Sequence, residues 1–280
     1  MISRRKLIQK SALGILGAAV IPHMDSTDII SQKTAAAGKP YPAYPSLDPG
    51  IVSEVVGKSH FDLERVKELV EAHPELAKAV WEWRFGDFES AIGAASHVGR
   101  RDIILYLLSN GASPSIFTFA ALGAYEIVKG IIDVSPGIQT SLGPHGISLL
   151  SHAEAGLRME KSMSQKETDN CKRLIDYLEE LDGADGPQYL EIPEEEKQAY
   201  LGNYMYGEGK EDGFTIQFNM RNQPSLGPVG GFGGALYKIE ENLFTYNGAP
   251  SVRISFLWEG DSVKSLTIKM PGSEVTAIKT

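Results

Sequence analysis

The stretch from Ser90 to Ala112, SAIGAASHVGRRDIILYLLSNGA, decides which fold we expect, because it holds two short helical patterns on either side of one glycine. Small residues over 91–96 let the first helix pack closely on its neighbours. Gly99 supplies a turn conformation that is costly for other residues. The second helix is predicted to bury an apolar face. That face consists of Ile103, Ile104, Leu107 and Leu108.

This unit resembles an ankyrin repeat, with an inner helix of small residues, a glycine turn, an apolar outer helix and an Asn-Gly-Ala exit at 110–112. The pattern recurs more weakly over 118–132 and 146–185. We therefore expect about four ankyrin-like repeats over residues 52–185, with divergent first and last copies that act as caps. Gly99 and Gly123 are only 24 residues apart, so the finger between these two repeats must be shortened. A generic array of helical hairpins is the alternative.

After residue 186 the apolar period changes from 3.6 to 2, which is typical of β-strands. Alternating segments lie at 214–220 and 252–258, and further strands are expected at 236–239, 243–246, 263–270 and 275–278. We expect residues 187–280 to form six or seven antiparallel strands in a small barrel or curved sheet. The expected fold class is thus α+β and multidomain, an ankyrin-like α-helical solenoid followed by a small antiparallel β-sheet or barrel.

The opening of this β module, YLGNY at 200–204, resembles the start of the accessory module appended to many exported β-lactamase-like serine hydrolases. The segments GALY at 234–237 and NLF at 242–244 fit the same pattern. In those proteins the nucleophile lies in another domain. The resemblance therefore implies an accessory role and no catalytic residue in this module.

The N-terminal residues have the pattern of an export signal. The segment SRRKLI at 3–8 resembles the twin-arginine motif, and an apolar run over 12–21, too short to span a bilayer, follows it. We expect a signal peptide over residues 1–37, a Pro-rich linker over 38–51 and a periplasmic or secreted protein. After cleavage no stable membrane insertion is expected. An amphipathic cytosolic N-terminus is the alternative.

Composition and motifs argue against several function classes. The formal net charge is -9, so a nucleic-acid partner is not expected, because phosphate binding needs clustered Lys and Arg. Cys171 is the single cysteine, which excludes an internal disulfide and a cysteine-based zinc cluster. No nucleophile elbow or phosphate-binding loop is present in the sequence. We therefore expect a protein that is not an enzyme.

The histidines do not show a metal-binding spacing. His145 and His152 are seven residues apart, but Gly146 is expected to interrupt any helix that joins them. His97 and His152 fall at the ends of inner helices, where the histidines of ankyrin repeats usually bond to the backbone. We therefore expect no metal ion and no cofactor.

An aromatic and basic cluster follows the first predicted helices and is the best candidate for a binding surface, because Trp and Arg dominate interface hot spots. The simpler interpretation, which we favour, is that these rings seal the first repeat against the second. The function expected from the sequence is non-catalytic binding of an unknown protein partner by the concave face of the repeats. The alternative is a small-ligand or glycan carrier, or a hydrolase accessory, acting through the β module. The candidate partner-binding residues are Trp81, Trp83, Arg84, Phe85, His97, Arg100 and His152.

Overall fold

The computed structural model describes residues 46–219, 222–231 and 233–280. Several of its short helices begin with a side-chain cap. Asp48, Asp62 and Ser90 each accept a hydrogen bond from a backbone N–H in the first turn of the helix that follows. The α-helices of this part are α2 (Pro49–Lys58), α3 (Leu63–Ala72), α4 (Ala91–Val98), α5 (Arg101–Ser109), α6 (Ile116–Ala121), α7 (Tyr125–Val134), α8 (Leu149–Ala155) and α9 (Gln165–Glu179). Four 3-10 helices lie between them: η1 (Pro74–Lys78), η2 (Ile138–Thr140), η3 (Pro144–Gly146) and η4 (Gly156–Ser162).

The unit predicted from residues 90–112 is present as two helices. α4 ends at Gly99, whose φ is +74°, and α5 follows directly. A Cβ atom at Gly99 would lie 1.8 Å from the carbonyl oxygen of Ala155. Ile103, Ile104 and Leu107 are fully buried on α5. The two predicted helices are confirmed, with Leu108 of the predicted face only partly buried. Small residues, a left-handed glycine and an apolar face all favour this arrangement.

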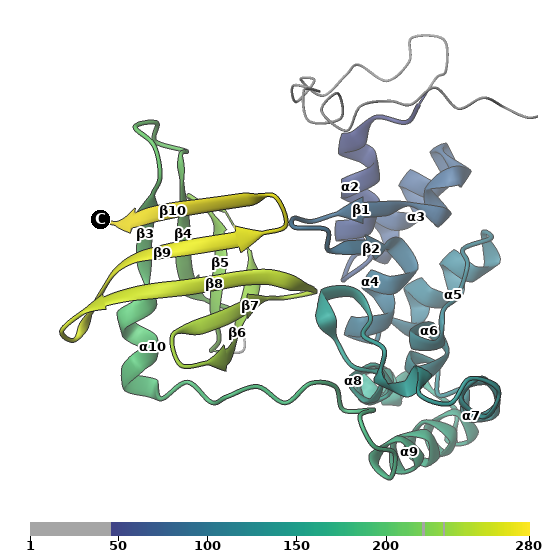
Figure 1. Cartoon of the computed structure of the whole chain (residues 1–280). Coiled ribbons are helices and arrows are strands. Elements are labelled where there is room, and N and C mark those ends of the chain that lie inside the picture. The colour runs from purple at the N-terminus through teal and green to yellow at the C-terminus, as the bar shows by residue number, and fades with distance from the viewer. Residues whose placement is uncertain (1–45, 220–221, 232) are drawn as a thin grey trace, which may run out of the picture. The chain divides into compact units, whose positions relative to one another are not determined.

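The expected ankyrin solenoid is wrong. The helices are short, α6 having only six residues, and they do not repeat as one regular unit. A β-hairpin of β1 (Val80–Glu82) and β2 (Phe88–Ser90) precedes α4, and η2 and η3 separate α7 from α8. Only residues 90–112 carry the full pattern, and the 24-residue spacing from Gly99 to Gly123 is shorter than an ankyrin repeat. The helices form an irregular array around two apolar cores, and Figure 1 shows their changing orientations.

The expected C-terminal barrel or curved sheet is a closed barrel, with eight strands in place of six or seven. They close in the order β10-β3-β4-β5-β6-β7-β8-β9, and every neighbouring pair is antiparallel. The sequence did not predict β3 or β5 as separate strands. Met220, at the end of one alternating segment, lies outside the described residues. The strands are β3 (Gly202–Met205), β4 (Gly213–Phe218), β5 (Pro224–Pro228), β6 (Gly234–Glu240), β7 (Leu243–Tyr246), β8 (Ala249–Glu259), β9 (Ser262–Met270) and β10 (Ser273–Lys279).

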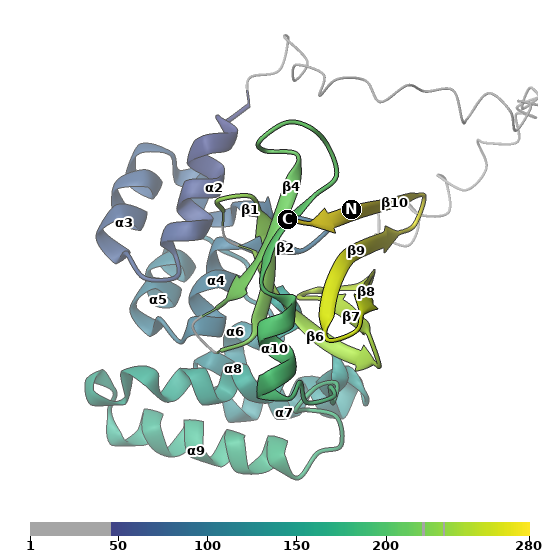
Figure 2. The same ribbon diagram turned by 90° about the vertical axis from the view of Figure 1, so that its left-hand side faces the viewer.

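The barrel encloses an aromatic core. The short helix α10 (Glu194–Tyr200) precedes β3 and contributes the fully buried ring of Tyr200. The centroid of this ring lies 5.1 Å from that of Phe244 and 4.6 Å from that of Phe256. Figure 2 shows α10 beside the strands, away from α2 and α3. The barrel interior is therefore filled by side chains at these positions.

The helices and the barrel belong to one compact unit, Leu47–Thr280. The expected signal peptide and most of the expected linker lie outside the described residues, and α2 begins at Pro49, within the last residues assigned to that linker. Among the helices of the described ranges, none is long and apolar enough to cross a membrane.

Candidate metal centre

The β1–β2 hairpin places a carboxylate in the interior of the helical part. Glu89 lies in β2, opposite Trp81 of β1, and its side chain is fully buried. The indole Nε1 of Trp83 donates a hydrogen bond to Oε2 of Glu89 at 2.7 Å. Oε1 of Glu89 accepts no well-directed hydrogen bond. A buried carboxylate oxygen is costly unless a proton donor or a cation faces it, so Oε1 identifies a place where either one would stabilise the structure.

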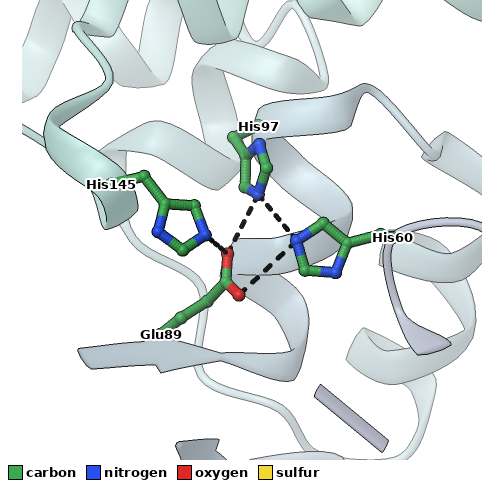
Figure 3. Close-up of side chains that lie close together, drawn as sticks. All are labelled: His60, Glu89, His97 and His145. Carbon is green, nitrogen blue, oxygen red and sulfur yellow. Dashed lines mark hydrogen bonds and ion pairs between the residues drawn. The ribbon is translucent and has the colours of Figure 1, made fainter. Parts of the chain in front are cut away.

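Three histidines from separate segments surround this carboxylate, as Figure 3 shows. His60 follows the C-terminus of α2, His97 lies in the last turn of α4, and His145 lies in η3. One ligand atom from each histidine and one from Glu89 all lie within 4.8 Å of one another.

The individual distances are short. Nε2 of His97 lies 2.9 Å from Oε1 of Glu89, and Nε2 of His145 lies 3.2 Å from the same oxygen. Nε2 of His60 lies 3.5 Å from Oε2 of Glu89 and 3.0 Å from Nε2 of His97. All three imidazoles therefore turn the same ring nitrogen toward the carboxylate.

Hydrogen-bond acceptors outside the cluster determine which ring nitrogen carries the proton in two of these histidines. Nδ1 of His60 lies 3.0 Å from the carbonyl oxygen of Gly57, which can only accept, so this nitrogen carries the proton. Nδ1 of His145 lies 2.7 Å from Oδ2 of the buried Asp87, and Oδ1 of Asp87 accepts from the backbone N–H of His145. In the neutral rings, Nε2 of both histidines then presents a lone pair to the cluster. Metal-binding histidines are usually held in this way.

The charges of the cluster depend on one another. Burial alone would raise the pKa of the Glu89 carboxyl, but the adjoining imidazoles of His145 and His97 outweigh burial and hold this pKa well below its usual range. Burial alone would lower the pKa of His145, but Asp87 and Glu89 raise it to about 10. For His97 burial dominates and its pKa is lowered. Glu89 is thus a carboxylate at neutral pH, as a metal ligand must be.

A cavity of about 1040 Å³ adjoins the cluster. The three histidines contribute to its wall, whereas the fully buried Glu89 does not. Aromatic side chains form much of the remaining wall on this side, and residues of β4 to β7 line the other side. A metal ion held by the cluster would therefore be accessible from this cavity.

The structure gathers five of the seven predicted binding residues around the cavity. These five are Trp81, Trp83, Arg84, Phe85 and His97. Trp81 and Trp83 also pack against the apolar core of the first helices, as the simpler interpretation expected. The same rings therefore serve packing and line a wall of the cavity.

The other two predicted residues do not join this wall. Arg100 is paired with Asp102 at 2.7 Å and donates to the carbonyl oxygen of Phe61. His152 is fully buried, and its Nδ1 lies 2.8 Å from the carbonyl oxygen of Ser148. That backbone contact was expected for His152, and its burial keeps it from contacting a partner.

Sequence reasoning did not bring together His60, Glu89, His97 and His145. Their separations of 29, 8 and 48 residues match no ligand motif. One signal was present in the hairpin itself. Asp87 immediately precedes β2 and is two residues from Glu89, the spacing at which residues of an extended chain share a face. Two inward carboxylates next to a Trp-x-Trp segment are unusual in a packed core.

Comparisons of the chain with protein-family models, curated proteins and solved structures find no match.

Proposed function

We propose that this protein binds one divalent first-row transition-metal ion through His60, Glu89, His97 and His145. The observation that carries the proposal is the convergence of three Nε2 atoms on the buried carboxylate of Glu89, those of His97 and His145 near Oε1 and that of His60 near Oε2. With Nδ1 of His60 protonated, Nε2 of a neutral His60 can only accept, so its 3.0 Å contact with Nε2 of His97 holds either a proton of His97 or a cation.

The distances between ligand atoms fit a metal ion. Four nitrogen or oxygen ligands at about 2.0–2.1 Å from a tetrahedral Zn²⁺ are about 3.3 Å from one another. Four separations, measured to either oxygen of Glu89, range from 2.9 to 3.5 Å, and all the ligand atoms lie within 4.8 Å of one another. The short contacts already match the tetrahedral spacing, and the longer ones would have to contract when an ion binds.

The ligand types narrow the choice of metal. Three imidazoles and one carboxylate suit Zn²⁺, Fe²⁺, Co²⁺ or Ni²⁺, whereas Ca²⁺ and Mg²⁺ prefer sites made entirely of oxygen ligands. Glu89 is ionised, and His145, whose pKa Asp87 and Glu89 raise to about 10, has to release a proton before its Nε2 can bind the ion.

The test uses the full chain after removal of metal by a chelator. Calorimetry with Zn²⁺, and visible absorption with Co²⁺, are expected to give one ion per chain and the intense bands of a low-symmetry cobalt site. His60→Ala removes a partly exposed ligand and is expected to weaken binding by more than the roughly 10–100-fold typical of an outer-shell change.

His73→Ala is the matched control, because His73 is exposed and lies outside the cluster. It is expected to bind metal like the original chain, and circular dichroism checks that both variants are folded. Equal metal affinity of the original chain and His60→Ala, or no binding by the original chain, would overturn the proposal.

Two sequence expectations remain as proposals. If Arg4 and Arg5 form a twin-arginine export signal, changing both to Lys is expected to trap the precursor in the cytoplasm, and normal export of that variant would contradict this proposal.

Non-catalytic binding of a protein partner is tested by affinity capture from a native periplasmic extract with the full chain. A partner lost on Trp83→Ala but not on His73→Ala would support it, whereas equal capture by both variants would contradict a role for Trp83.

A further inference from the structure

The proposed metal ion would have a free coordination position on the cavity side. The protein supplies four ligands, and Fe²⁺, Co²⁺ and Ni²⁺ accept five or six, while Zn²⁺ expands to five. Glu89 is fully buried, and only the three imidazole ligands face the cavity. A fifth ligand would therefore arrive through the cavity.

Aromatic rings shape the cavity next to this position. Trp81, Trp83 and Phe85 line it from the β1–β2 hairpin, and Tyr246 lines it from β7. The rings of Phe85 and Tyr246 meet edge to face, with centroids 4.7 Å apart. Such a wall favours a flat, apolar ring as the body of the ligand.

The backbone is strained at two positions around the cavity. Phe85 has φ +58° and His145 has φ +59°, which is the left-handed region. A phenylalanine rarely adopts this conformation, and residues held in it cluster at ligand clamps and active sites. The turn that holds Phe85 is closed by hydrogen bonds from Trp83 N to Asp87 O at 2.9 Å and from Asp87 N to Arg84 O at 3.0 Å.

The charges of the wall favour an anion. Arg84 lines the cavity and forms no ion pair with a carboxylate of residues 46–219, 222–231 or 233–280. Asp87 also lines it, but His145 occupies both of its oxygens. Arg158 and Glu211 also line the cavity and carry opposite charges. A bound divalent cation would add positive charge to the cavity wall.

We propose that the cavity binds a small aromatic carboxylate whose carboxylate oxygen coordinates the metal ion and whose ring lies among Trp81, Trp83, Phe85 and Tyr246. This inference rests on the proposed metal site. The volume of about 1040 Å³ is sufficient for a ligand of two fused rings.

The experiment uses the full chain loaded with Co²⁺ and titrated with 2-naphthoate. The carboxylate is expected to shift the cobalt absorption bands saturably. Acetate, which lacks the ring, is expected to bind at least about tenfold more weakly. 2-Naphthylmethanol, which lacks the charge, is expected to leave the cobalt bands unchanged.

Phe85→Ala tests the wall without touching a metal ligand. It is expected to weaken 2-naphthoate about tenfold, the effect of one aromatic contact, at unchanged cobalt stoichiometry. Phe88→Ala is the matched control, because Phe88 lies on the same hairpin but is 65 % exposed and does not line the cavity. It is expected to bind 2-naphthoate like the original chain.

The two proposals fail in distinguishable ways. A chain that binds cobalt but shows no spectral response to 2-naphthoate, or the same affinity for 2-naphthoate and acetate, overturns this inference alone. Equal loss of affinity in Phe85→Ala and Phe88→Ala also overturns it. A chain that binds no cobalt overturns the metal site as well.

Discussion

The indole of Trp83 donates a hydrogen bond of 2.7 Å to the carboxylate of Glu89. This hydrogen bond joins the aromatic wall of the cavity directly to the proposed metal centre. The hydrogen bond occupies Oε2 and leaves Oε1 directed at the Nε2 atoms of His97 and His145. Trp83 therefore orients a proposed metal ligand, Glu89, without being one itself.

Trp83→Phe keeps an aromatic ring but removes this donor. We expect metal affinity to fall by roughly 10–100-fold, the range for the loss of an outer-shell partner, while one ion per chain is still bound at saturation. Calorimetry with Zn²⁺ measures this loss. Trp81→Phe is the control, since no hydrogen bond joins Trp81 to any of the four cluster residues. Equal affinities of the two variants would show that the indole does not position Glu89.

Local chemistry was enough to predict some of the fold. Small residues before Gly99 and an apolar face after it predicted α4 and α5, and strict alternation over 252–258 predicted part of β8. The solenoid failed because it depended on degenerate copies of one strong unit, and the η segments between them have no regular spacing. The candidate site escaped prediction because its four ligands come from four segments, and only the tertiary packing brings them together.

Gly99 is expected to be intolerant of any side chain. Its φ is +74°, and a Cβ would lie 1.8 Å from the carbonyl oxygen of Ala155, a backbone atom that cannot rotate away. Gly99→Ala therefore combines left-handed strain with a clash, and we expect a loss of about 3 kcal/mol or more. Gly137 has φ +97°, but no atom lies within 4 Å of a Cβ added there. Gly137→Ala is therefore expected to cost only the backbone strain, about 1–2 kcal/mol of unfolding free energy. Urea unfolding measures both, and equal losses would mean that α8 does not press on Gly99.

Leu107 tests the buried face of α5. It is fully buried in the first apolar core, whereas Leu105 on the same helix is 49 % exposed. Leu107→Ala is expected to cost about 2–5 kcal/mol of unfolding free energy because it leaves a cavity. Leu105→Ala is expected to change it by less than about 0.5 kcal/mol, as at other surface positions. A small loss at Leu107 would contradict the packing of α5 described above.

Glu196 is expected to make the stability of the barrel sensitive to acid. Burial alone would raise its pKa, but Lys238, whose Nζ lies 2.7 Å from Oε1, and the hydroxyl of Tyr200 outweigh burial and lower it. Because the pKa in the folded state is below the unfolded value, the unfolded chain binds more protons between the two values. The stability contributed by Glu196 is therefore present above the unfolded pKa and is lost as the pH falls through the folded pKa.

Glu196→Gln removes this titration and leaves Lys238 without its partner. We expect a loss of about 1–3 kcal/mol at pH 7, typical of a hydrogen bond to a charged group, and a smaller decrease in stability between pH 5 and pH 3 than in the original chain. Urea midpoints at the three pH values measure both effects. Glu195→Gln is the control, because Glu195 is exposed on the same helix and makes no ion pair with a described residue. If both variants lose stability with acid as steeply as the original chain, the Glu196–Lys238 contact does not contribute to the acid sensitivity of the fold.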